Sequence, residues 1–382
     1  MKKLKMGMVG GGLDAFMGDV HRKAAAFDDK IELVCGAFSS NPEKSLKTAE
    51  YLGLSPKRSY ADYKEMIEKE SQLSEDERMD FVTIITPNHM HFPPAKMALE
   101  NGFHVVCDKP ITLTLEEAYD LVKITEKSGK VLCLTHTYTG YPIVRQAKEM
   151  VKKGDLGDIR KVVVNYLQGW MSTEDYINTN ESGWRSDPNK SGIGGSLGDV
   201  GTHAANMVEE VTGLRISEIA ADLTGFGKNR QLDDDGNILI RLENGGKGII
   251  SYSQIATGEE NAFSFKVYGT KGSLEWHQEK PTELIAKWVD RPKEIYTPGG
   301  YGTYEESTRY TRVPSGHPEG YFEAFATLYN NFAREVLSVK EGNPVSEELD
   351  FPTVVDGLRG MQFIYGAVAS SDNNAAWVSL IE

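Results

Sequence analysis

Short apolar runs alternate with amphipathic, helix-like segments over the first part of the chain. Five of these runs are rich in Val and Ile: KMGMVGG, KIELVCGAF, DFVTIITP, FHVVCDKP and KVLCLTH. Such runs are typical of strands that are buried on both faces. The segments between them carry helix signals, such as Asn41 as an N-cap before Pro42, and a capping box of Thr114 and Glu117. Alternating strands and helices predict a doubly wound parallel sheet, an α/β Rossmann domain, over residues 1–137.

The pattern changes after this point. A helical segment, PIVRQAKEMVKKG, leads into the strand-like run IRKVVVNYLQGW, and further strand-like runs follow with few helices between them. LENGGKG, between two alternating runs, indicates a hairpin. Two helices near residues 319–338 and 352–371 end the chain. We therefore predict a second, α+β domain over residues 138–382, with a large open and mainly antiparallel sheet that serves substrate binding and oligomerisation.

Length and charge narrow the function classes. A chain of 382 residues fits two domains, and a net charge of −14 without a basic stripe argues against nucleic acid or an anionic membrane as partner. No apolar run is long enough to span a bilayer or to form a signal peptide. Cys35, Cys107 and Cys133 lie in apolar runs without metal-ligand spacing, which predicts reduced thiols, no metal site and a cytoplasmic location.

A glycine-rich turn follows the first predicted strand. Gly10, Gly11 and Gly12 open a helix, and this is the context in which a dinucleotide pyrophosphate binds. The third glycine of the usual pattern would fall at Ala15, and Gly18 comes three residues later, so the loop is longer than usual. The alternative is an ordinary strand-to-helix turn.

The end of the second predicted strand does not carry the acid that binds the ribose of NAD. The residues there are Ser39, Ser40 and Lys44. A neutral or basic pocket accepts the 2′-phosphate of NADP, and hydroxyl groups also tolerate NAD. The cofactor is therefore NAD or NADP.

Polar residues also follow the third and fourth predicted strands. Ligands of open α/β sheets bind at the carboxyl ends of the strands. We therefore expect six residues on the cofactor edge: Thr86, Pro87, Asn88, His91, Lys109 and Pro110. The alternative for Lys109 is a solvated surface charge. His21, at the start of the first helix, is interpreted as a packing or loop-fixing residue.

The stretch GGSLGDVGTH places Asp199 and His203 four residues apart. If a helix begins near residue 199, both side chains lie on one face. The glycines before them let the backbone approach a flat partner, such as a nicotinamide or a sugar ring. The alternative is an Asp N-cap beside an unrelated histidine.

Together, these motifs resemble the glucose–fructose oxidoreductase / inositol dehydrogenase / MocA family. The resemblance rests on VGGG…H, TPNHMH, DKP, GWRSDPNKSGIGGSLGDVGTH and VYGTKGSLEW, which cover most of the chain. It implies a sugar or polyol dehydrogenase whose catalytic residues are Lys109, Asp199 and His203. The chain departs from the family in its longer phosphate loop and in Asp108, where Glu is more usual.

The expected mechanism assigns a role to each catalytic residue. His203 is the general base, Asp199 orients its imidazole, and Lys109 holds the hydroxyl and stabilises developing alkoxide charge. Lys109 as the proton acceptor remains an alternative. Further substrate contacts are expected from Tyr138, Tyr141, Arg185 and His317, and the resemblance brings Trp184 and Arg185 close to the cofactor as well.

Two other function classes remain open. One is a glycosidase or lyase that uses bound nicotinamide for transient oxidation, and the other is a nucleotide-sensing protein without catalysis. Open sheets of this kind need covering, so we expect a homodimer or homotetramer.

Overall fold

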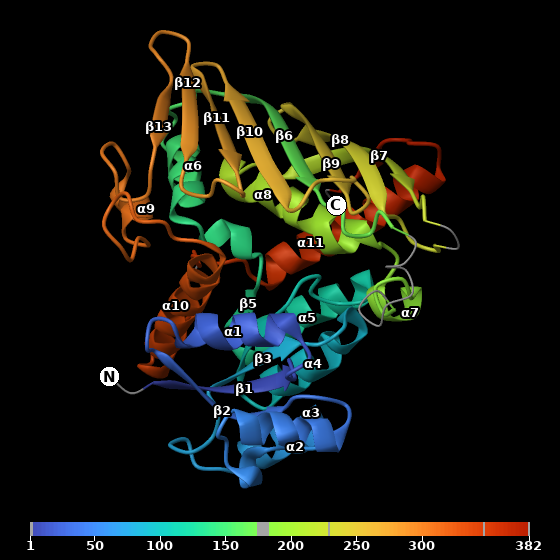
Figure 1. The fold of residues 1–382 in the computed structure, drawn as a ribbon, viewed down its shortest axis with the longest axis vertical. Helices are drawn as coiled ribbons and strands as arrows, with labels where there is room; N and C mark the ends of the chain where they lie inside the picture. The colour runs from blue at the N-terminus through green and yellow to red at the C-terminus, as the bar shows by residue number, and fades with distance from the viewer. Residues whose placement is uncertain (1–2, 174–182, 228–229, 347, 381–382) are drawn as a thin grey trace. The chain divides into compact units, whose positions relative to one another are not determined.

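The computed structural model describes residues 3–173, 183–227, 230–346 and 348–380 (Figure 1). The chain forms two compact units. The first contains the residues up to Thr137 together with Phe325–Leu358, and the second contains Tyr138–Ala324 together with the residues from Arg359 onward. No helix in the described part of the chain is long and apolar enough to cross a bilayer.

The first unit is built on a five-stranded parallel sheet in the order β2-β1-β3-β4-β5. This confirms the predicted doubly wound sheet. The strands are β1 (Leu4–Gly10), β2 (Ile31–Ala37), β3 (Phe81–Ile85), β4 (His104–Cys107) and β5 (Leu132–Leu134). The helices between them are α1 (Phe16–Ala26), α2 (Pro42–Tyr51), α3 (Tyr63–Ser71), α4 (Phe92–Glu100) and α5 (Leu115–Ser128). Asn41 caps α2 and Thr114 forms the capping box with Glu117, as predicted.

The strand order reverses between β1 and β3, and this is where ligands bind in folds of this type. Gly10, the last residue of β1, pairs with Ile85, the last residue of β3. The glycine turn and the residues after β3 therefore meet at the same edge of the sheet.

The first unit also recruits a segment from late in the chain. The sequence predicts a single boundary after residue 137, whereas Phe325–Leu358 also belongs to the first unit. The reason is burial: α10 (Tyr321–Lys340) places Phe332 against Phe81 of β3, with ring centroids 5.0 Å apart. The amide of Leu134 in β5 also donates to the carbonyl of Pro352 at 2.7 Å. Sequence periodicity predicts the helix but not the sheet that it covers.

The second unit holds a nine-stranded sheet in the order β13-β12-β11-β10-β6-β9-β8-β7-β14. Among the described strands of this sheet, β6 and β9 form the only parallel pair, so the prediction of a mainly antiparallel sheet is confirmed. The central strands are β6 (Ile159–Leu167), β7 (Ile216–Thr224), β8 (Asp235–Leu242), β9 (Lys247–Ser253) and β10 (Ala262–Gly269). The others are β11 (Gly272–His277), β12 (Leu284–Trp288), β13 (Glu294–Tyr296) and β14 (Val378–Ser379).

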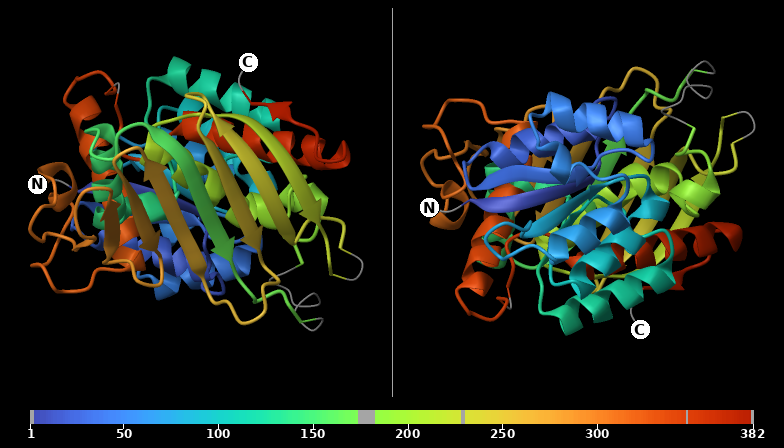
Figure 2. Two further views of the ribbon diagram at one scale, coloured as in Figure 1. Left: turned by 90° about the horizontal axis from the view of Figure 1, so that it is seen from above. Right: turned by 90° about the horizontal axis from the view of Figure 1, so that it is seen from below.

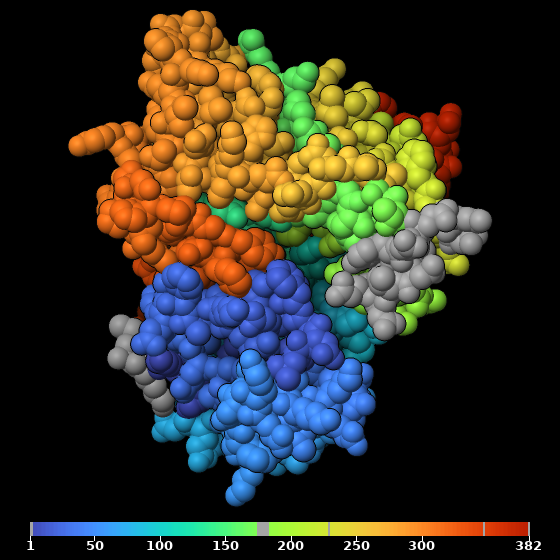
Figure 3. Space-filling view, viewed as in Figure 1, coloured from blue at the N-terminus to red at the C-terminus, as the bar shows by residue number. Residues whose placement is uncertain are grey.

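Helices lie against one face of this sheet and leave the other face open (Figure 2). The helices of the second unit are α6 (Pro142–Lys152), α7 (Pro188–Ser191), α8 (Thr202–Thr212), α9 (Glu305–Thr308) and the larger part of α11 (Val354–Asp372). Tyr301, between β13 and α9, is fully exposed, and the orange part of the chain that follows β11 reaches the surface in this view (Figure 3).

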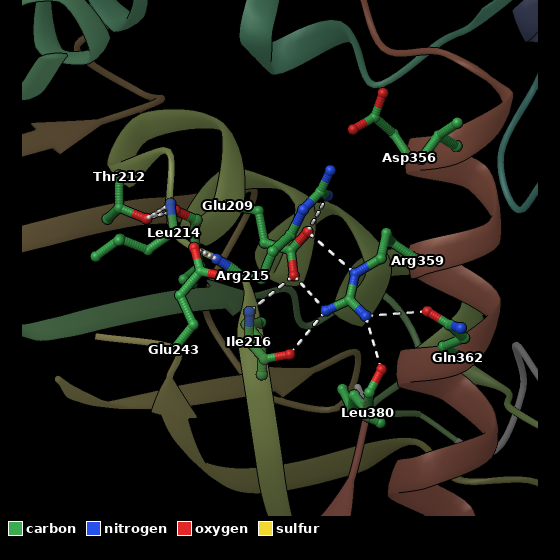
Figure 4. Close-up of polar contacts among 12 residues, drawn as sticks. Glu209, Thr212, Leu214, Arg215, Ile216, Glu243, Asp356, Arg359, Gln362 and Leu380 are labelled. Carbon is green, nitrogen blue, oxygen red and sulfur yellow. Dashed lines mark hydrogen bonds and ion pairs between the residues drawn. The ribbon is translucent and has the colours of Figure 1, made fainter. Parts of the chain in front are cut away.

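One ion-pair network ties α8, α11, β7 and the last strand together (Figure 4). Glu209 of α8 accepts from Arg359 of α11 at 2.6 Å and from Arg215 at 2.8 Å. Arg359 also donates to the carbonyls of Ile216 at 2.7 Å and Leu380 at 2.9 Å. Because both charges are largely buried and fully hydrogen-bonded, the network fixes where the end of the chain meets β7.

The start of α1 packs on the glycine turn at backbone distance. A Cβ atom on Gly18 would lie 2.4 Å from the carbonyl oxygen and 2.6 Å from the Cα of Gly11. Gly18 therefore performs the helix-packing role of the third glycine of the dinucleotide pattern, three residues later than usual. Leu13 and Asp14 in the lengthened loop are exposed, and so is Phe16, the first residue of α1.

Replacing Gly18 with Ala should push α1 away from the turn. We expect the free energy of unfolding to fall by about 1–3 kcal/mol, since the clash is with backbone rather than with a flexible side chain. Urea denaturation measures this change. Gly360→Ala is the matched control, because a Cβ there meets nothing within 4 Å on a helix, and it should leave stability unchanged or raise it by about 0.5–1 kcal/mol. Equal stability of the Gly18→Ala and wild-type proteins would contradict this packing role.

Candidate active site

The glycine turn after β1 has the geometry of a phosphate cradle. Gly10 and Gly11 have φ angles of +81° and +69°, and a Cβ on Gly10 would lie 2.5 Å from the carbonyl oxygen of Ile85. Arg22, one turn into α1, donates to the carbonyl of Gly11 at 2.5 Å and thereby fixes the turn. Among the described residues, no side chain caps the first turn of α1. The amide of Gly18 donates to the carbonyl of Ala15 at 3.0 Å, and the uncapped N–H groups before it suit an anion. These features fit a dinucleotide pyrophosphate.

The residues after β2 form a hydroxyl-rich corner next to this turn. Gly12 lies against the end of β2, since a Cβ on it would be 3.2 Å from the carbonyl oxygen of Phe38. Ser39 accepts from the amide of Asn41 at 3.2 Å. The ammonium group of Lys44 is 3.0 Å from the carboxylate of Asp14, which comes from the lengthened glycine loop. The one predicted cation of this corner is therefore paired with an acid.

His91 links the two loops that follow β3 and β4. It is buried, and its Nδ1 lies 2.6 Å from the carbonyl oxygen of Pro110, while its Nε2 lies 2.8 Å from that of Thr86. Burial lowers the pKa of His91. Both ring nitrogens face backbone, so the ring fixes the positions of Thr86 and Pro110. Contact between His91 itself and the cofactor stays a prediction.

Lys109 sits among buried imidazoles at the end of β4. The peptide bond from Lys109 to Pro110 is cis. The carboxylate of Asp108 accepts from the hydroxyl of Thr135 at 2.7 Å and from the amide of Lys109 at 3.0 Å. Burial lowers the pKa of His136 to about 3, with Lys109 as the second cause. The lysine thus stands beside an oriented carboxylate and an uncharged imidazole.

In the second unit, Asp199 and His203 lie at the start of a helix. The sequence is compatible with a helix that begins near residue 199; in the structure, residues Leu197–Gly201 form a π-helical turn that runs into α8. The carboxylate of Asp233 accepts from the amides of Gly195 and Leu197, both at 2.7 Å. A Cβ on Gly195 would lie 2.3 Å from the carbonyl oxygen of Asp233. The glycines of this stretch therefore let the turn dock onto the backbone before β8.

A network of neutral side chains orients Asp199. Gln254, just after β9, donates to Asp199 at 2.8 Å and accepts from Ser196 at 2.7 Å. The same amide group of Gln254 reaches Gln168 at 3.2 Å. The guanidinium of Arg185 is 3.9 Å from Asp199 and stacks on Trp184. The structure thus places Arg185, one of the predicted contacts, close to Asp199, and Trp184 next to Arg185.

His203 packs against the aromatic side chains of the same unit. Its ring centroid is 5.0 Å from that of Tyr138 and 6.1 Å from that of Tyr166, and it is largely buried. The hydroxyl groups of the two tyrosines are 2.5 Å apart. Tyr166 in turn donates to Asn261 at 2.9 Å. Asp199 and His203 are therefore held by one continuous group of residues.

Two predicted substrate contacts lie in other surroundings. Tyr141 is buried against Trp276, with ring centroids 5.6 Å apart, which is a packing role. His317 is exposed, and its Nδ1 lies 3.0 Å from the carbonyl of Pro314 in its own turn. Substrate contact by these two residues stays a prediction.

Sequence reasoning missed Arg22, Asp233 and Gln254. Arg22 comes directly after His21 on the helix that follows the glycine turn. A basic residue this close to the turn is a signal by which it could have been identified. Asp233 and Gln254 are far from Asp199 in sequence, and only the pairing of β8 with β9 brings them to the π-helical turn. No local pattern marks either residue.

Comparison with known proteins agrees with this geometry. Residues 4–136 match the family described as "Oxidoreductase family, NAD-binding Rossmann fold", and residues 144–275 match the "GFO/IDH/MocA C-terminal domain". An inositol dehydrogenase homolog from Azotobacter vinelandii, solved with NAD+, is 33% identical, with a TM-score of 0.95 over 99% of this chain and 97% of that one. The same homolog has been solved with NADH and myo-inositol.

Two further relatives cover the full length. An oxidoreductase from Sinorhizobium meliloti is 44% identical, with a TM-score of 0.88 over 99% of this chain and 100% of that one. Levoglucosan dehydrogenase from Pseudarthrobacter phenanthrenivorans is 28% identical over 100% of this chain and 99% of its own length. With an NAD-binding Rossmann domain followed by the matching C-terminal domain, the chain belongs to the GFO/IDH/MocA family of oxidoreductases.

Proposed function

We propose that the chain is an NAD(P)-dependent dehydrogenase that acts on a hydroxyl-bearing carbon of a sugar, glycoside or inositol. The observation that carries this proposal is the Asp199–His203 pair, held by neutral amide and tyrosine side chains. Neutral donors and aromatic rings suit a polyhydroxylated substrate. The complexes of relatives with NADH and myo-inositol, and with NADH and levoglucosan, support the same class.

Each residue has its own role in the proposed reaction. His203 accepts the hydroxyl proton, and Asp199, oriented by Gln254, stabilises the imidazolium that forms. Lys109 holds the substrate hydroxyl and favours developing charge on its oxygen. The bound nicotinamide supplies the hydride acceptor. The glycine turn and the start of α1 hold its pyrophosphate, and the residues after β3 and β4 line the same edge.

We further propose that NAD is preferred over NADP. Lys44 is the basic residue that would attract a 2′-phosphate, and the carboxylate of Asp14 pairs with it. An acid at this corner repels a phosphate and can accept from ribose hydroxyls instead. Asp14 comes from the lengthened loop, so the loop supplies the acid that is missing after β2.

We also propose a homodimer or homotetramer that forms through the open face of the nine-stranded sheet. Leu239 pairs with Ile249, and Ile249 pairs with Val163, so three apolar side chains form a row across the central strands. Leu239 and Ile249 are 50% and 37% exposed. An exposed apolar row of this kind is typical of an interface. The three buried and unbridged cysteines, all within the described residues, support a reducing cytoplasm as the location.

The activity can be tested by titration with NAD and NADP, followed by a screen of sugars, glycosides and inositols at a wavelength of about 340 nm, where the reduced nicotinamide absorbs. We expect net reduction of the cofactor with one polyol. Lys109→Ala and His203→Ala should each lower kcat/KM by about 10²–10⁴-fold, since each removes a group that acts on the reacting oxygen or its proton. Lys123→Ala, an exposed change on α5, is the control.

Other outcomes separate the alternatives. Glycoside cleavage without net reduction of cofactor would indicate the glycosidase or lyase. Nucleotide binding without any turnover would indicate the sensor, and no nucleotide binding would contradict all three.

The cofactor preference is measured by calorimetry as a ratio of dissociation constants. We expect NAD to bind about tenfold or more tightly than NADP. Asp14→Asn should improve NADP binding by about threefold to tenfold, because one negative charge near the 2′-phosphate is removed, and should weaken NAD binding, because a ribose hydroxyl loses its carboxylate acceptor. Asp19→Asn is the control, since Asp19 is an exposed acid on α1 that pairs with Lys23. Equal affinity of the wild-type protein for both nucleotides would overturn the preference.

The interface is tested by sedimentation velocity. Ile249→Asp places a charge in the apolar row and should convert the oligomer to monomer at micromolar concentration, since an unpaired charge in an interface costs several kcal/mol. Tyr51→Asp, an exposed aromatic on α2, should leave the assembly unchanged. A wild-type monomer, or an Ile249→Asp oligomer, would rule out this face.

A further inference from the structure

His21 is a buried histidine for which the proposed chemistry has no use. It lies on α1 and is fully buried, and its Nδ1 is 2.7 Å from the hydroxyl of Tyr329 on α10. That hydroxyl lies 3.3 Å from the hydroxyl of Thr83 on β3. The ring of Phe325 packs edge-on against the imidazole, with centroids 4.9 Å apart. These contacts fix the position of the ring within the first unit.

The other ring nitrogen points toward Asp108. Nε2 of His21 lies 3.9 Å from the Oδ2 atom of Asp108. It has no hydrogen-bond partner among the residues that the structure describes. Buried polar atoms are nearly always paired, so an unpaired one aimed at a carboxylate requires an explanation.

The state of the imidazole follows from its surroundings. Burial is the main cause that lowers the pKa of His21 to about 4, so the ring is neutral near pH 7 and carries a single N–H. A lone pair on Nε2 would be repelled by the carboxylate of Asp108, whereas an N–H is attracted. The proton therefore sits on Nε2, Nδ1 accepts from Tyr329, and Tyr329 accepts from Thr83. The donors therefore follow one direction, from Thr83 to Tyr329 and from Tyr329 to His21, and the N–H of His21 faces Asp108 at 3.9 Å.

Asp108 connects this chain of hydrogen bonds to Lys109. Its Oδ1 atom accepts from Thr135 and from the amide of Lys109, which leaves Oδ2 to face His21. The amide of Asp108 donates to the carbonyl of Ile84 at 3.1 Å. The carboxylate thus sets the direction in which the chain leaves β4, immediately before Lys109.

We propose that His21 is a positioning residue for Lys109: its Nε2–H, set by Tyr329 and Thr83, orients the carboxylate of Asp108 and through it the Lys109 side chain. The inference rests on the proposed function in that Lys109 acts on the substrate. Its structural part, the direction of the hydrogen bonds and their effect on Lys109, is independent of turnover.

Two variants of one residue separate positioning from packing. His21→Gln keeps a neutral N–H donor near the position of Nε2, and His21→Leu keeps the bulk without a donor. We expect His21→Leu to lower kcat by about tenfold or more with the dissociation constant for NAD within about twofold of wild type, and His21→Gln to keep kcat within about threefold. The control is His104→Leu, which removes another buried imidazole of the first unit, on β4. The His104 imidazole accepts from the amide of Val131 instead, so kcat of that variant should stay within about twofold.

A double-mutant cycle with Asp108→Asn identifies the route of the effect. If His21 acts through Asp108, His21→Leu should lower kcat by less than about twofold further in the Asp108→Asn protein. Losses that multiply, or equal losses in His21→Leu and His21→Gln, would overturn the proposal.

A second readout does not depend on turnover. Nitrogen-15 NMR of histidine-labelled protein should show the proton on Nε2 of His21, and the rate of amine modification of Lys109, followed by mass spectrometry, should change in His21→Leu but not in His21→Gln. A proton on Nδ1, or equal modification rates in all variants, would overturn the inference. If the wild-type protein reduces no cofactor with any polyol, the proposed function fails, and these two measurements still decide the role of His21.

Discussion

The contact between the backbones of Gly11 and Gly18 is the constraint on which the first unit depends. It brings α1 so close to the glycine turn that no Cβ fits between them. Since a helix is rigid, this one contact also fixes the residues of the next turn. Arg22 reaches the carbonyl of Gly11, and His21 reaches Tyr329. The same helix, α1, therefore positions the glycine turn, which suits a pyrophosphate, and His21, which faces Asp108 next to Lys109.

In the second unit, a buried carboxylate fixes the position of the π-helical turn. Asp233 is buried, and burial raises its pKa, yet it accepts from two backbone amides and from the hydroxyl of Tyr252. These bonds hold the start of the π-helical turn against the residues just before β8. A π-turn inserts an extra residue into a helix and is often found at functional sites. Here it carries Asp199 directly into the region that Gln254 and Arg185 reach.

The sequence predicts the local elements of this protein well and its long-range contacts poorly. The five parallel strands, the hairpin at LENGGKG and the last two helices follow from periodicity and turn residues, since these signals are local. The resemblance to a family selects Lys109, Asp199 and His203. The membership of α10 in the first unit, the anchor at Asp233 and the amide of Gln254 depend on which strands pair. No pattern within these segments predicts that pairing. The π-turn was missed because its glycines are equally compatible with an ordinary helix start.

Around both Lys109 and Asp199, the described residues include neutral side chains that lie next to a charged group. Buried imidazoles and a hydroxyl lie beside Asp108 and Lys109. An amide donates to Asp199, which also faces the guanidinium of Arg185 at 3.9 Å, and tyrosine rings pack near His203. Buried neutral partners orient a charge without cancelling it, so the charge stays available for a reacting oxygen or proton. Because burial keeps His136 neutral, this imidazole lies close to Lys109 without adding a second positive charge beside the ammonium group, which suits the role proposed for Lys109.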